Sequence, residues 1–531
     1  MTDRSLAVLT PWYPSLGNPV LGNFVAEWSR LAAGGFDVRV VNSVEWPGGP
    51  KELVDTHRPA FDGLIRRMGQ AGALDARGEF GTVTRVPHAL VGGWSVPQRA
   101  ASAVDAVAGA LPGLEADVMH GHVTYFGGLL AARLAGSATR VVVTEHSSEA
   151  RTVLADPLGR DLYAEVLDRA AYLTCVSGQV RDLILGHLPG YDDKVVVVPN
   201  PVDFDGAPRR VAPPEALDRW VFVGGLLEIK GVQRLMAAFT RFAGGRPAAT
   251  LDLFGDGPIR AELEDAVRVA GLGGRVRFHG NVPKPSVLAA LPRFDVLVAP
   301  SRYETFHLAV SEAVAAGLPV VVTRSGGPEE ALGDTIRLCG RFIDVAEDPA
   351  GILDAVADIE AGLGGLDPVG ARRELTARYG PAAVRARLAE LYDVPPWTPA
   401  RAATGQAGPA PEGIEVFARR TWRSPAVEPQ IALAEAHGAS VHTVGVPQPR
   451  PTARPLSVPQ RALRKARRLV GGLRPTPPPA VAGAGTVALL GDLTSAADLA
   501  SFWDANPAVR PSVELDPTLF GLPPVDAAEA G

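Results

Sequence analysis

The chain has 531 residues, of which 46% are hydrophobic and 21% are charged, and its formal net charge is −6. This length is too great for one compact core, so we expect two or three domains of an ordinary soluble, globular type. The negative net charge excludes a general attraction to nucleic acid, and we expect no nucleic-acid partner.

Two further features favour a cytoplasmic protein. The apolar run before Pro11 is too short for a signal peptide, and no stretch reaches the roughly 18 continuous apolar residues of a membrane span. Cys175 and Cys339 both lie in apolar surroundings, which favours buried reduced thiols over a disulfide or a metal site.

Short β-branched runs alternate with helix-like segments such as NFVAEWSRLAAGG and YFGGLLAARLAG. Continuous apolar strands separated by helices are typical of parallel sheets that are covered on both faces. The expected strands are too many for one doubly wound sheet. In chain order they are Leu6–Leu9, Val38–Val41, Val118–His120, Val141–Thr144, YLTCVS, KVVVVP, RWVFVG, TLDLFG, RVRFHG, DVLVAP and PVVVTR.

The proline-rich stretch 199–218 marks the boundary between two domains. We predict an α/β chain with two doubly wound, Rossmann-like parallel-sheet domains, residues 1–198 and 199–395, which face each other across a cleft. Residues 396–531 are expected to hold proline-rich linkers, small accessory α/β segments and a basic helix, or to be partly disordered. The strands expected in this tail are GIEVFARR, SVHTVGV and TVALLGD, and the first two flank an expected helix, VEPQIALAEAHG.

Ligands of open parallel sheets bind beyond the carboxyl ends of the strands. The first strand of the second domain ends at Gly224 and Gly225, and Lys230 follows. Paired glycines let backbone N–H groups approach an anion and the lysine adds a point charge, although a glycine turn with a solvated lysine is the alternative. The strand RVRFHG leads to Asn281 and Val282, where backbone groups are expected to meet a planar base.

The stretch PSRYETFHLAVSEAVAAGLPVVVT, residues 300–323, places two glutamates in a largely apolar run. Glu304 falls in the loop after a strand, and Glu312 falls near the middle of a helix expected from about Phe306 to Ala316. The N-terminus of this helix would hold phosphate oxygens, and the carboxylates would accept hydrogen bonds from hydroxyl groups. The alternative is that Glu312 is an ordinary surface charge.

This stretch resembles the E-x(7)-E motif of glycosyltransferase family 4, whose members are retaining enzymes with the GT-B fold. The resemblance covers residues 1–395 and includes, in the family's order, TPWYPSLGNPVLGNFV, VVVTEHSS, VVPNPVD, FVGGLLEIKGVQRL, LDLFGDGPIRAELE and VRFHGNV. It implies a hexosyltransferase of polysaccharide or glycolipid biosynthesis. Such an enzyme moves a sugar from a nucleoside-diphosphate sugar, held by the second domain, to a glycan, lipid-linked or small-molecule acceptor on the first.

The resemblance also implies roles for single residues. The expected catalytic residues are His146, which faces the donor sugar, Glu304, which contacts the transferring sugar, and Lys230, which grips the diphosphate. Glu312 would bind the ribose, and Gly22 would open the first helix close to the phosphates. The other expected donor-binding residues are Gly224, Gly225, Asn281, Val282, Thr305, Phe306, His307 and Leu308.

Two positions depart from the family's pattern. Gly225 stands where an arginine is common, so one phosphate-binding charge is missing unless another arginine such as Arg324 replaces it. His307 stands where a glycine is frequent, which would reshape the sugar pocket. Both departures bear on the identity of the donor.

We expect neither a cofactor nor a metal. Lys230 and the helix N-terminus can stabilise the departing diphosphate, and the D-x-D at Asp203–Asp205 lies in the interdomain turn. The resemblance implies attack by the acceptor on the face that the diphosphate leaves, with the leaving phosphate taking the proton.

Two other functions compete with this one. An oxidoreductase or epimerase would need G-x-G-x-x-G after the first strand, which instead leads into TPWYPSLGNP. An inactive GT-B scaffold that binds a nucleotide sugar or a glycan is the second alternative. In the tail, residues 459–474 form a basic amphipathic pattern that suits peripheral contact with the inner face of the plasma membrane, or else a solvated linker helix.

Overall fold

The computed structural model describes residues 4–14, 20–50, 74–78, 80–92, 94–204, 208–395, 415–419, 440–444 and 486–487. The chain forms two compact units. The first contains residues 1–42, 78–82 and 114–402, and the second contains residues 43–77, 83–113 and 403–531. Each unit is described by itself.

The N-terminal sheet includes, in this order, the strands β2-β1-β5-β6-β7-β8 of the first unit, and these neighbours pair in parallel. All six strands were predicted, although β2 is much longer than Val38–Val41. Their bounds are β1 Ser5–Thr10, β2 Asp37–Pro50, β5 Val118–His122, β6 Arg140–Glu145, β7 Tyr172–Cys175 and β8 Val195–Val197. The helices are α1 Asn23–Ala32, the π-helix η1 Val123–Gly128, α5 Leu129–Leu134, α6 Ala150–Ala155, α7 Pro157–Arg169 and α8 Gly178–His187.

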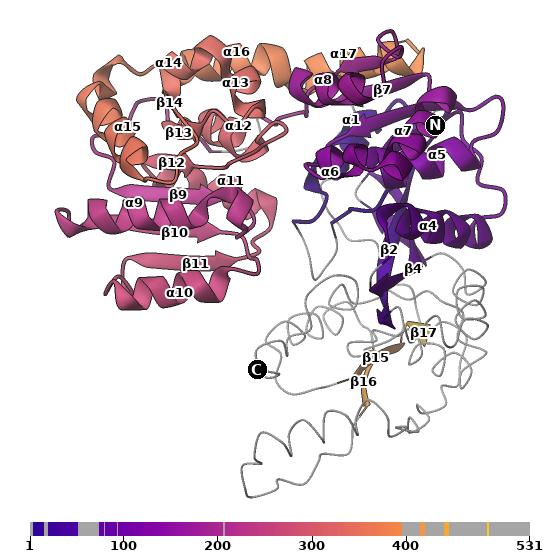
Figure 1. The fold of residues 1–531 in the computed structure, drawn as a ribbon, viewed down its shortest axis with the longest axis horizontal. Coiled ribbons are helices and arrows are strands. Elements are labelled where there is room, and N and C mark those ends of the chain that lie inside the picture. The colour runs from indigo at the N-terminus through magenta and orange to yellow at the C-terminus, as the bar shows by residue number, and fades with distance from the viewer. Residues whose placement is uncertain are drawn as a thin grey trace, which may run out of the picture. The chain divides into compact units, whose positions relative to one another are not determined.

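The second sheet of this unit has the order β11-β10-β9-β12-β13-β14 and is parallel throughout. Its strands are β9 Arg219–Val223, β10 Thr250–Phe254, β11 Val276–Gly280, β12 Val296–Ala299, β13 Val320–Thr323 and β14 Gly340–Ile343. Its α-helices are α9 Val232–Gly244, α10 Arg260–Val269, α11 Lys284–Ala290, α12 Leu308–Ala315, α13 Gly327–Leu332, α14 Ile336–Cys339, α15 Ala350–Ala361 and α16 Pro368–Tyr379. The last helix of the unit, α17 Pro381–Tyr392, packs instead against the N-terminal sheet, where Tyr392 contacts His120 and Phe36 (Figure 1). Short 3₁₀ turns are η2 Glu228–Lys230, η3 Leu291–Arg293, η4 Gly333–Thr335 and η5 Leu363–Gly365.

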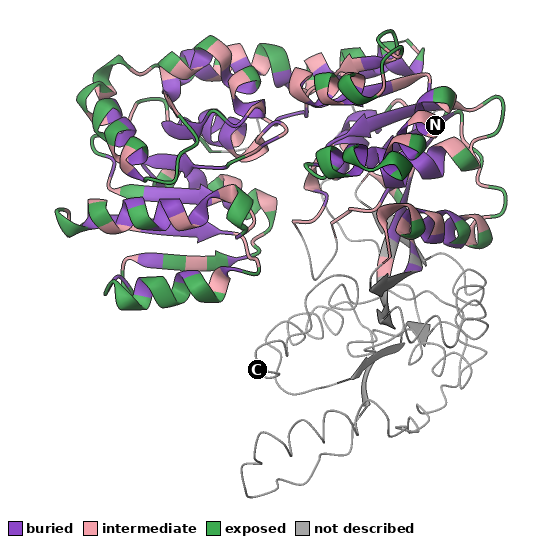
Figure 2. Cartoon of the chain, in the orientation of Figure 1, coloured by how far each residue is buried: buried purple, intermediate pink, exposed green. Residues whose placement is uncertain are grey.

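Helices flank the strands of both sheets, and central strands such as β5, β12 and β13 are buried along their whole length (Figures 1 and 2). In the second sheet, Trp220 on β9 is fully buried and its ring centroid lies 5.6 Å from that of Phe239 on α9. Removing such a side chain from a packed core costs about 3–5 kcal/mol. The sheets therefore provide the rigid base from which the loops project.

The order of the strands decides which loops meet. In the second sheet, β9 lies beside β12. From this pair, β10 and β11 extend the sheet to one side, and β13 and β14 extend it to the other. In the first sheet, β1 and β5 form the corresponding pair. Ligands of open parallel sheets bind beyond the carboxyl ends of the strands at such points.

The described parts of the second unit include a helix and a small parallel sheet. Helix α4, Val96–Ala110, begins with a capping box in which Gln98 accepts a hydrogen bond of 2.9 Å from the N–H of Ser95. The sheet has the order β16-β15-β17. The strands of this unit are β3 Leu74–Gly78 and β4 Gly81–Gly92, each of which crosses into the first unit, and β15 Glu415–Arg419, β16 Ser440–Val444 and β17 Thr486–Val487.

The three strands of this sheet coincide with the predicted GIEVFARR, SVHTVGV and TVALLGD. The expected helix VEPQIALAEAHG and the basic segment 459–474 lie outside the described residues. Among the helices that are described, none is long and apolar enough to cross a membrane.

Candidate active site

A partly buried ion pair joins the loops that follow β9 and β12. The Nζ atom of Lys230 lies 2.7 Å from Oε1 of Glu304, and the two side chains are 28% and 8% exposed. These residues are 74 positions apart in the sequence, and they meet because β9 and β12 are neighbours in the sheet. Both residues were predicted from the sequence as parts of one site.

Backbone contacts hold both loops in place. The N–H of Glu304 donates to the carbonyl of Ser325 at 3.1 Å, and its carbonyl accepts from the N–H of Gly327 at 3.0 Å. Gly231, directly after Lys230, has φ +67°, and a Cβ there would lie 2.1 Å from the carbonyl oxygen of Pro300. Only a glycine permits this close approach between the two loops.

The surroundings of Glu304 keep its carboxylate charged. Burial by itself would raise the pKa of Glu304, but attraction to His307 and Lys230 and hydrogen bonds from Lys230 and Ser301 lower the pKa below its ordinary value. Ser301 Oγ donates to Glu304 Oε1 at 2.7 Å. Burial lowers the pKa of His307, and Glu304 offsets this only in part. Lys230 is therefore the lasting positive charge beside Glu304 at neutral pH.

His307 shapes the entrance to helix α12. The sequence predicted a helix from about Phe306, which is wrong by two residues because His307 adopts a left-handed conformation with φ 73° and the helix starts at Leu308. The Nε2 atom of His307 is buried without a hydrogen-bond partner, 3.5 Å from Glu304 Oε1. The Phe306 side chain is only 3% exposed and packs edge-on against Tyr379, with the ring centroids 5.2 Å apart. Phe306 is thus a packing side chain, and only its backbone remains for a ligand.

The first domain contributes His146, which directly follows β6. Its backbone carbonyl accepts a hydrogen bond of 3.1 Å from Thr305 Oγ1, so the predicted residues of the two domains are in contact. The ring of His146 is packed against Phe24, with the centroids 4.5 Å apart. Burial lowers the pKa of His146 to about 3, so its imidazole is neutral at physiological pH.

The sequence analysis missed two histidines beside His146. His122, the last residue of β5, places Nδ1 2.9 Å from Nε2 of His146, and its ring stacks on that of His120 with the centroids 4.3 Å apart. His120 in turn contacts the hydroxyl groups of Tyr392 and Thr144, each at 2.6 Å. The available signal was the pair of histidines in VMHGH, two positions apart at the end of a predicted strand and thus on one face.

A strained turn follows these histidines. Val123 has φ 67°, a conformation that β-branched residues rarely adopt, and it opens the π-helix η1. Gly127 lies so close to the strand end that a Cβ there would be 2.1 Å from the Leu9 carbonyl oxygen and 2.4 Å from that of His122. Strain and π-helical turns both cluster at functional sites, which agrees with the placement of His122 and His146.

The predicted glycines have different physical roles. Gly22 caps α1 with φ +69°, and a Cβ there would lie 2.3 Å from the carbonyl oxygen of Trp12, so no other residue fits. Gly224 donates its N–H to the carbonyl of Phe254 at 2.9 Å. A Cβ added at Gly225 would make ordinary van der Waals contacts, with the Leu227 side chain at 3.4 Å and the carbonyl oxygen of Asp256 at 3.9 Å. The arginine that is common at this position in the family is therefore not excluded by the fold.

Arg324, considered above as a substitute for that arginine, is paired elsewhere. Its guanidinium lies over the ring of Phe342, 4.7 Å from the centroid, and 3.8 Å from Asp344. Asn281 and Val282 lie between β11 and α11, exposed and half-buried respectively. They lead directly to a residue that the sequence analysis did not select, Lys284.

Glu312 lies on α12, as predicted, and is largely buried. Its carboxylate pairs with Lys284 Nζ at 2.9 Å, and the same ammonium lies 3.5 Å from Glu27 of the first domain. The three side chains are 12%, 14% and 19% exposed, respectively. The alternative that Glu312 is an ordinary surface charge is therefore wrong.

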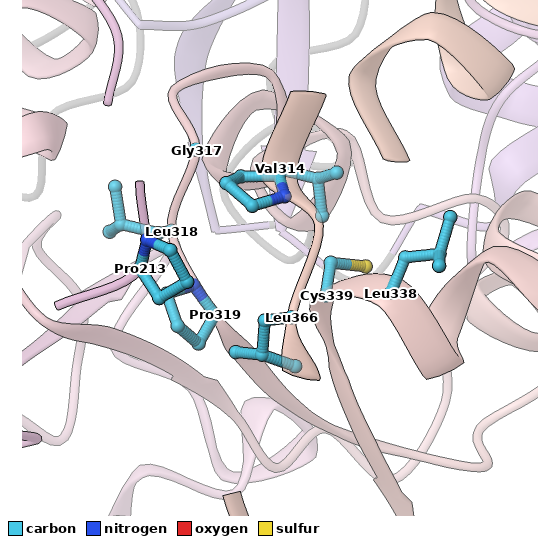
Figure 3. Close-up of a pocket in the computed structure, with 9 residues that line it drawn as sticks. Pro213, Val314, Gly317, Leu318, Pro319, Leu338, Cys339 and Leu366 are labelled. Carbon is cyan, nitrogen blue, oxygen red and sulfur yellow. The ribbon is translucent and has the colours of Figure 1, made fainter. Parts of the chain in front are cut away.

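A small apolar pocket behind α12 is separate from these residues (Figure 3). Val314, Gly317 and Leu318 line it together with Cys339 and none of its lining residues is an expected site residue. Burial raises the pKa of the Cys339 thiol to about 12, so this cysteine is unreactive. Within the described ranges, no group of three or more His, Cys, Asp or Glu side chains is arranged to hold a metal ion.

Comparison with known families decides the identity of this arrangement. The family model described as Glycosyltransferase Family 4 matches residues 22–205, and the model described as Glycosyl transferases group 1 matches residues 218–360. Together they cover more than half of the chain, including β5–β8 of the first sheet and every strand of the second. The chain belongs to the family 4 and group 1 glycosyltransferases.

Curated relatives of this glycosyltransferase span several reactions. It is 29% identical to the 2-deoxystreptamine N-acetyl-D-glucosaminyltransferase of Streptomyces fradiae over 406 residues, which are 70% of this chain and 89% of that protein. It is also 29% identical to the glycogen synthase of Mycobacterium tuberculosis over 309 residues, covering 56% of this chain and 67% of that enzyme.

Solved structures agree on the fold. The sucrose-phosphate synthase of Thermosynechococcus elongatus superposes with a TM-score of 0.56 at 19% identity, covering 73% of this chain and 98% of that one. HepE of Anabaena, in complex with UDP and glucose, superposes with a TM-score of 0.51 at 16% identity, covering 74% of this chain and 100% of that one. The glycosyltransferase thus has the GT-B fold that the sequence predicted.

Proposed function

We propose that this glycosyltransferase moves a hexose-type sugar, with retention of its anomeric configuration, from a nucleoside-diphosphate sugar to a hydroxyl group of an acceptor. The observation that carries the proposal is the partly buried contact of 2.7 Å between Lys230 and Glu304. It brings a cation for the diphosphate and a carboxylate for sugar hydroxyls together beyond the carboxyl ends of β9 and β12, the neighbouring strands at which the strand order reverses.

The proposed chemistry needs charge stabilisation rather than a protein nucleophile. As the bond from the anomeric carbon to phosphate breaks, negative charge grows on the diphosphate, and Lys230 and the N–H groups of Leu308 and Ala309 at the start of α12 stabilise it. The acceptor oxygen attacks on the same face, and the leaving phosphate takes its proton. In the free enzyme, Glu304 holds Lys230 near the position that the diphosphate would occupy.

The other site residues have supporting parts in this proposal. Glu304 would accept hydrogen bonds from the transferring sugar, and Glu312 from the ribose. The unpartnered Nε2 of His307 and the neutral ring of His146 would face the sugar. Gly22, Gly224, Gly225, Asn281, Val282, Thr305 and Leu308 would contribute backbone or hydroxyl groups around the donor.

The acceptor class stays broad in the proposal. The names of the relatives above include a polysaccharide synthase and an enzyme that acts on 2-deoxystreptamine, a small molecule. A glycan, a lipid-linked and a small-molecule acceptor are therefore all retained. We propose that the donor site needs neither a cofactor nor a metal.

The decisive experiment is turnover of a panel of UDP- and GDP-sugars by the purified chain. We expect one donor to be hydrolysed slowly without acceptor, and expect Glu304→Gln to lower this rate by at least about 100-fold, as removal of a transition-state contact does. Excess EDTA should leave the rate unchanged. Proton NMR of the transfer product with a simple alcohol should show the anomeric configuration of the donor. If no donor binds or turns over, the proposal is wrong, and an inverted product would contradict retention alone.

A further inference from the structure

Lys284 occupies an unusual position for a lysine. Its side chain is only 14% exposed, although lysine is almost never buried unless it is paired. It is paired twice, with Glu312 of the second domain at 2.9 Å and with Glu27 of the first domain at 3.5 Å. The three residues come from α11, α12 and α1.

The charges in this cluster are fixed by their neighbours. Burial by itself would lower the pKa of Lys284, but the attraction of Glu312 and Glu27 raises it above the ordinary lysine value, so the ammonium stays charged. Glu27 has a second cation, because Arg30 on the same helix donates to its other oxygen at 2.8 Å. Glu312 has no such second cation among its described ion pairs. Loss of Lys284 would therefore leave Glu312 as an uncompensated buried charge.

The carboxylate of Glu312 can accept a hydrogen bond from one more partner. Its contact with Lys284 uses Oε1, and a carboxylate can accept several hydrogen bonds on its two oxygens. Lys284 lies two residues after Val282, at the loop that is proposed to meet the base. The lysine thus holds the carboxylate in one orientation at the edge of the nucleotide site.

We propose that Lys284 is a positioning residue that orients Glu312 for the donor ribose and, through Glu27, makes nucleotide binding depend on contact between the two domains. This inference rests on the proposed function. The described ion pairs of Glu27 are with Arg30 and Lys284, neither of which is an expected donor-binding residue, yet through Lys284 Glu27 contributes to nucleotide affinity. By reciprocity, a bound nucleoside diphosphate strengthens the contact between the domains.

The test is calorimetric binding of UDP and GDP to the full-length chain. For the nucleotide that the wild type binds, we expect Lys284→Met to weaken binding at least about tenfold, as loss of charged hydrogen bonds does, and Lys284→Arg to restore most of it. We expect Glu27→Gln to weaken binding several-fold, although it does not reach the ligand. In the Lys284→Met background, Glu27→Gln should have no further effect.

Controls separate this coupling from a loss of folding. Lys194→Met removes a lysine whose Nζ donates to the carbonyl of Leu167 in the first domain, away from this cluster, and should bind as the wild type does. Thermal unfolding of every variant reports whether it is folded. If Lys284→Met fails to fold, the conservative Glu27→Gln variant alone decides the result.

The outcomes distinguish the two proposals. If the wild type binds neither nucleotide and turns over no donor, the proposed function is wrong and this inference falls with it. Two outcomes overturn only the coupling through Lys284, provided that the wild type binds a nucleotide. In the first, Glu27→Gln leaves the nucleotide affinity unchanged. In the second, Glu27→Gln weakens nucleotide binding as much in the Lys284→Met background as in the wild type.

Discussion

Glu304 carries more contacts than any sequence pattern suggested for it. Lys230 and Ser301 both donate to the same oxygen, Oε1, at 2.7 Å. Its backbone joins the turn at Gly326 as an isolated parallel bridge. A side chain that is held at both its backbone and its carboxylate can present its free oxygen in one direction. That rigidity suits recognition of a sugar hydroxyl.

Gly225 offers a gain-of-function experiment. Its backbone lies outside the left-handed region, and a Cβ there would be in ordinary contact with the Leu227 side chain and the Asp256 carbonyl oxygen. We expect Gly225→Arg to restore the charge that the family commonly places here and to lower the Kd of the nucleotide sugar about tenfold. Isothermal titration calorimetry measures the change.

Gly225→Met is the matched control for that experiment, because it adds length without charge. If both variants bind alike, the added charge does not reach the diphosphate, and the missing arginine does not explain donor affinity.

At the scale of residues, the sequence identified several residues that lie together in the site, but it missed a residue whose burial depends on distant parts of the chain. Lys230, Glu304, His146 and Thr305 were selected and lie in contact in pairs. Lys284 was not selected, because NVPKPS resembles any solvated loop. Its burial depends on Glu27, which is far away in the sequence. No local pattern contains that information.

Helix α1 shows how one backbone position controls an element. Gly22 starts the helix in a left-handed conformation against the Trp12 carbonyl. We expect Gly22→Ala to destabilise the first domain by about 1–3 kcal/mol, since it forces both backbone strain and a clash. It should also weaken nucleotide binding, because α1 carries Glu27. Urea unfolding and calorimetry provide the two measurements.

Gly186→Ala in α8 serves as the control, because nothing lies within 4 Å of its added Cβ. Equal stability of the two variants would show that the close approach at Gly22 is relaxed in solution.

The histidines of β5 give the first domain a defined response to acid. Burial lowers the pKa of His120 to about 3 from an ordinary value of 6.5. Between these values the unfolded chain binds a proton that the folded chain does not. His120 therefore stabilises the fold fully above about pH 6.5, and this contribution falls as the pH falls toward 3. Going from pH 7 to pH 5, the loss is about 2 kcal/mol for this residue.

Urea unfolding at pH 7 and pH 5 tests this expectation. Between pH 7 and pH 5, the free energy of unfolding should fall for both the wild type and His120→Gln. The fall should be about 2 kcal/mol smaller for His120→Gln, which lacks the titrating histidine. His187→Gln, at an exposed position on α8, should behave as the wild type does. Parallel pH dependences for all three proteins would contradict a neutral, buried His120.

At the scale of elements, apolar runs identified the strands of the second sheet except one edge strand. Strand β14 was missed because Arg341 interrupts its run, which an edge strand tolerates. The start of α12 was placed too early, because an apolar pattern does not reveal the left-handed backbone of His307. The extent of β2 beyond Val41 has no apolar signature, since PGGP ends it.

At the scale of the whole molecule, two sheets of one compact unit each supply one part of the site. The contacts between them include the N–H of Gly178, which donates to Glu330 at 2.6 Å, and the guanidinium of Arg151, which lies over the ring of Tyr303. Domains of one chain are expected to move relative to each other unless the interface between them is large and hydrophobic. Closure on a bound donor would follow from the same contacts.

The basic segment 459–474 stays a prediction, because it lies outside the described residues. If it binds lipid, the full-length chain should co-sediment with vesicles that contain phosphatidylserine, and added salt should release it. Deletion of residues 459–474 should abolish co-sedimentation and leave nucleotide affinity unchanged. Equal sedimentation of both chains would exclude a membrane role for this segment.

Because β9 and β12 are neighbours in the sheet but far apart in the sequence, the chain can be cut into two fragments that each carry one of these strands. Gly273 and Gly274 are exposed between α10 and β11, with open space around them. A cut there leaves β9 with Lys230 on one fragment, and β12 with Glu304 on the other. Neither half can bind a diphosphate and its sugar together until β9 and β12 pair again. Nucleotide-sugar binding would therefore serve as a direct reporter of fragment complementation, and the enzyme could be rebuilt as a split sensor for any two proteins fused to its halves.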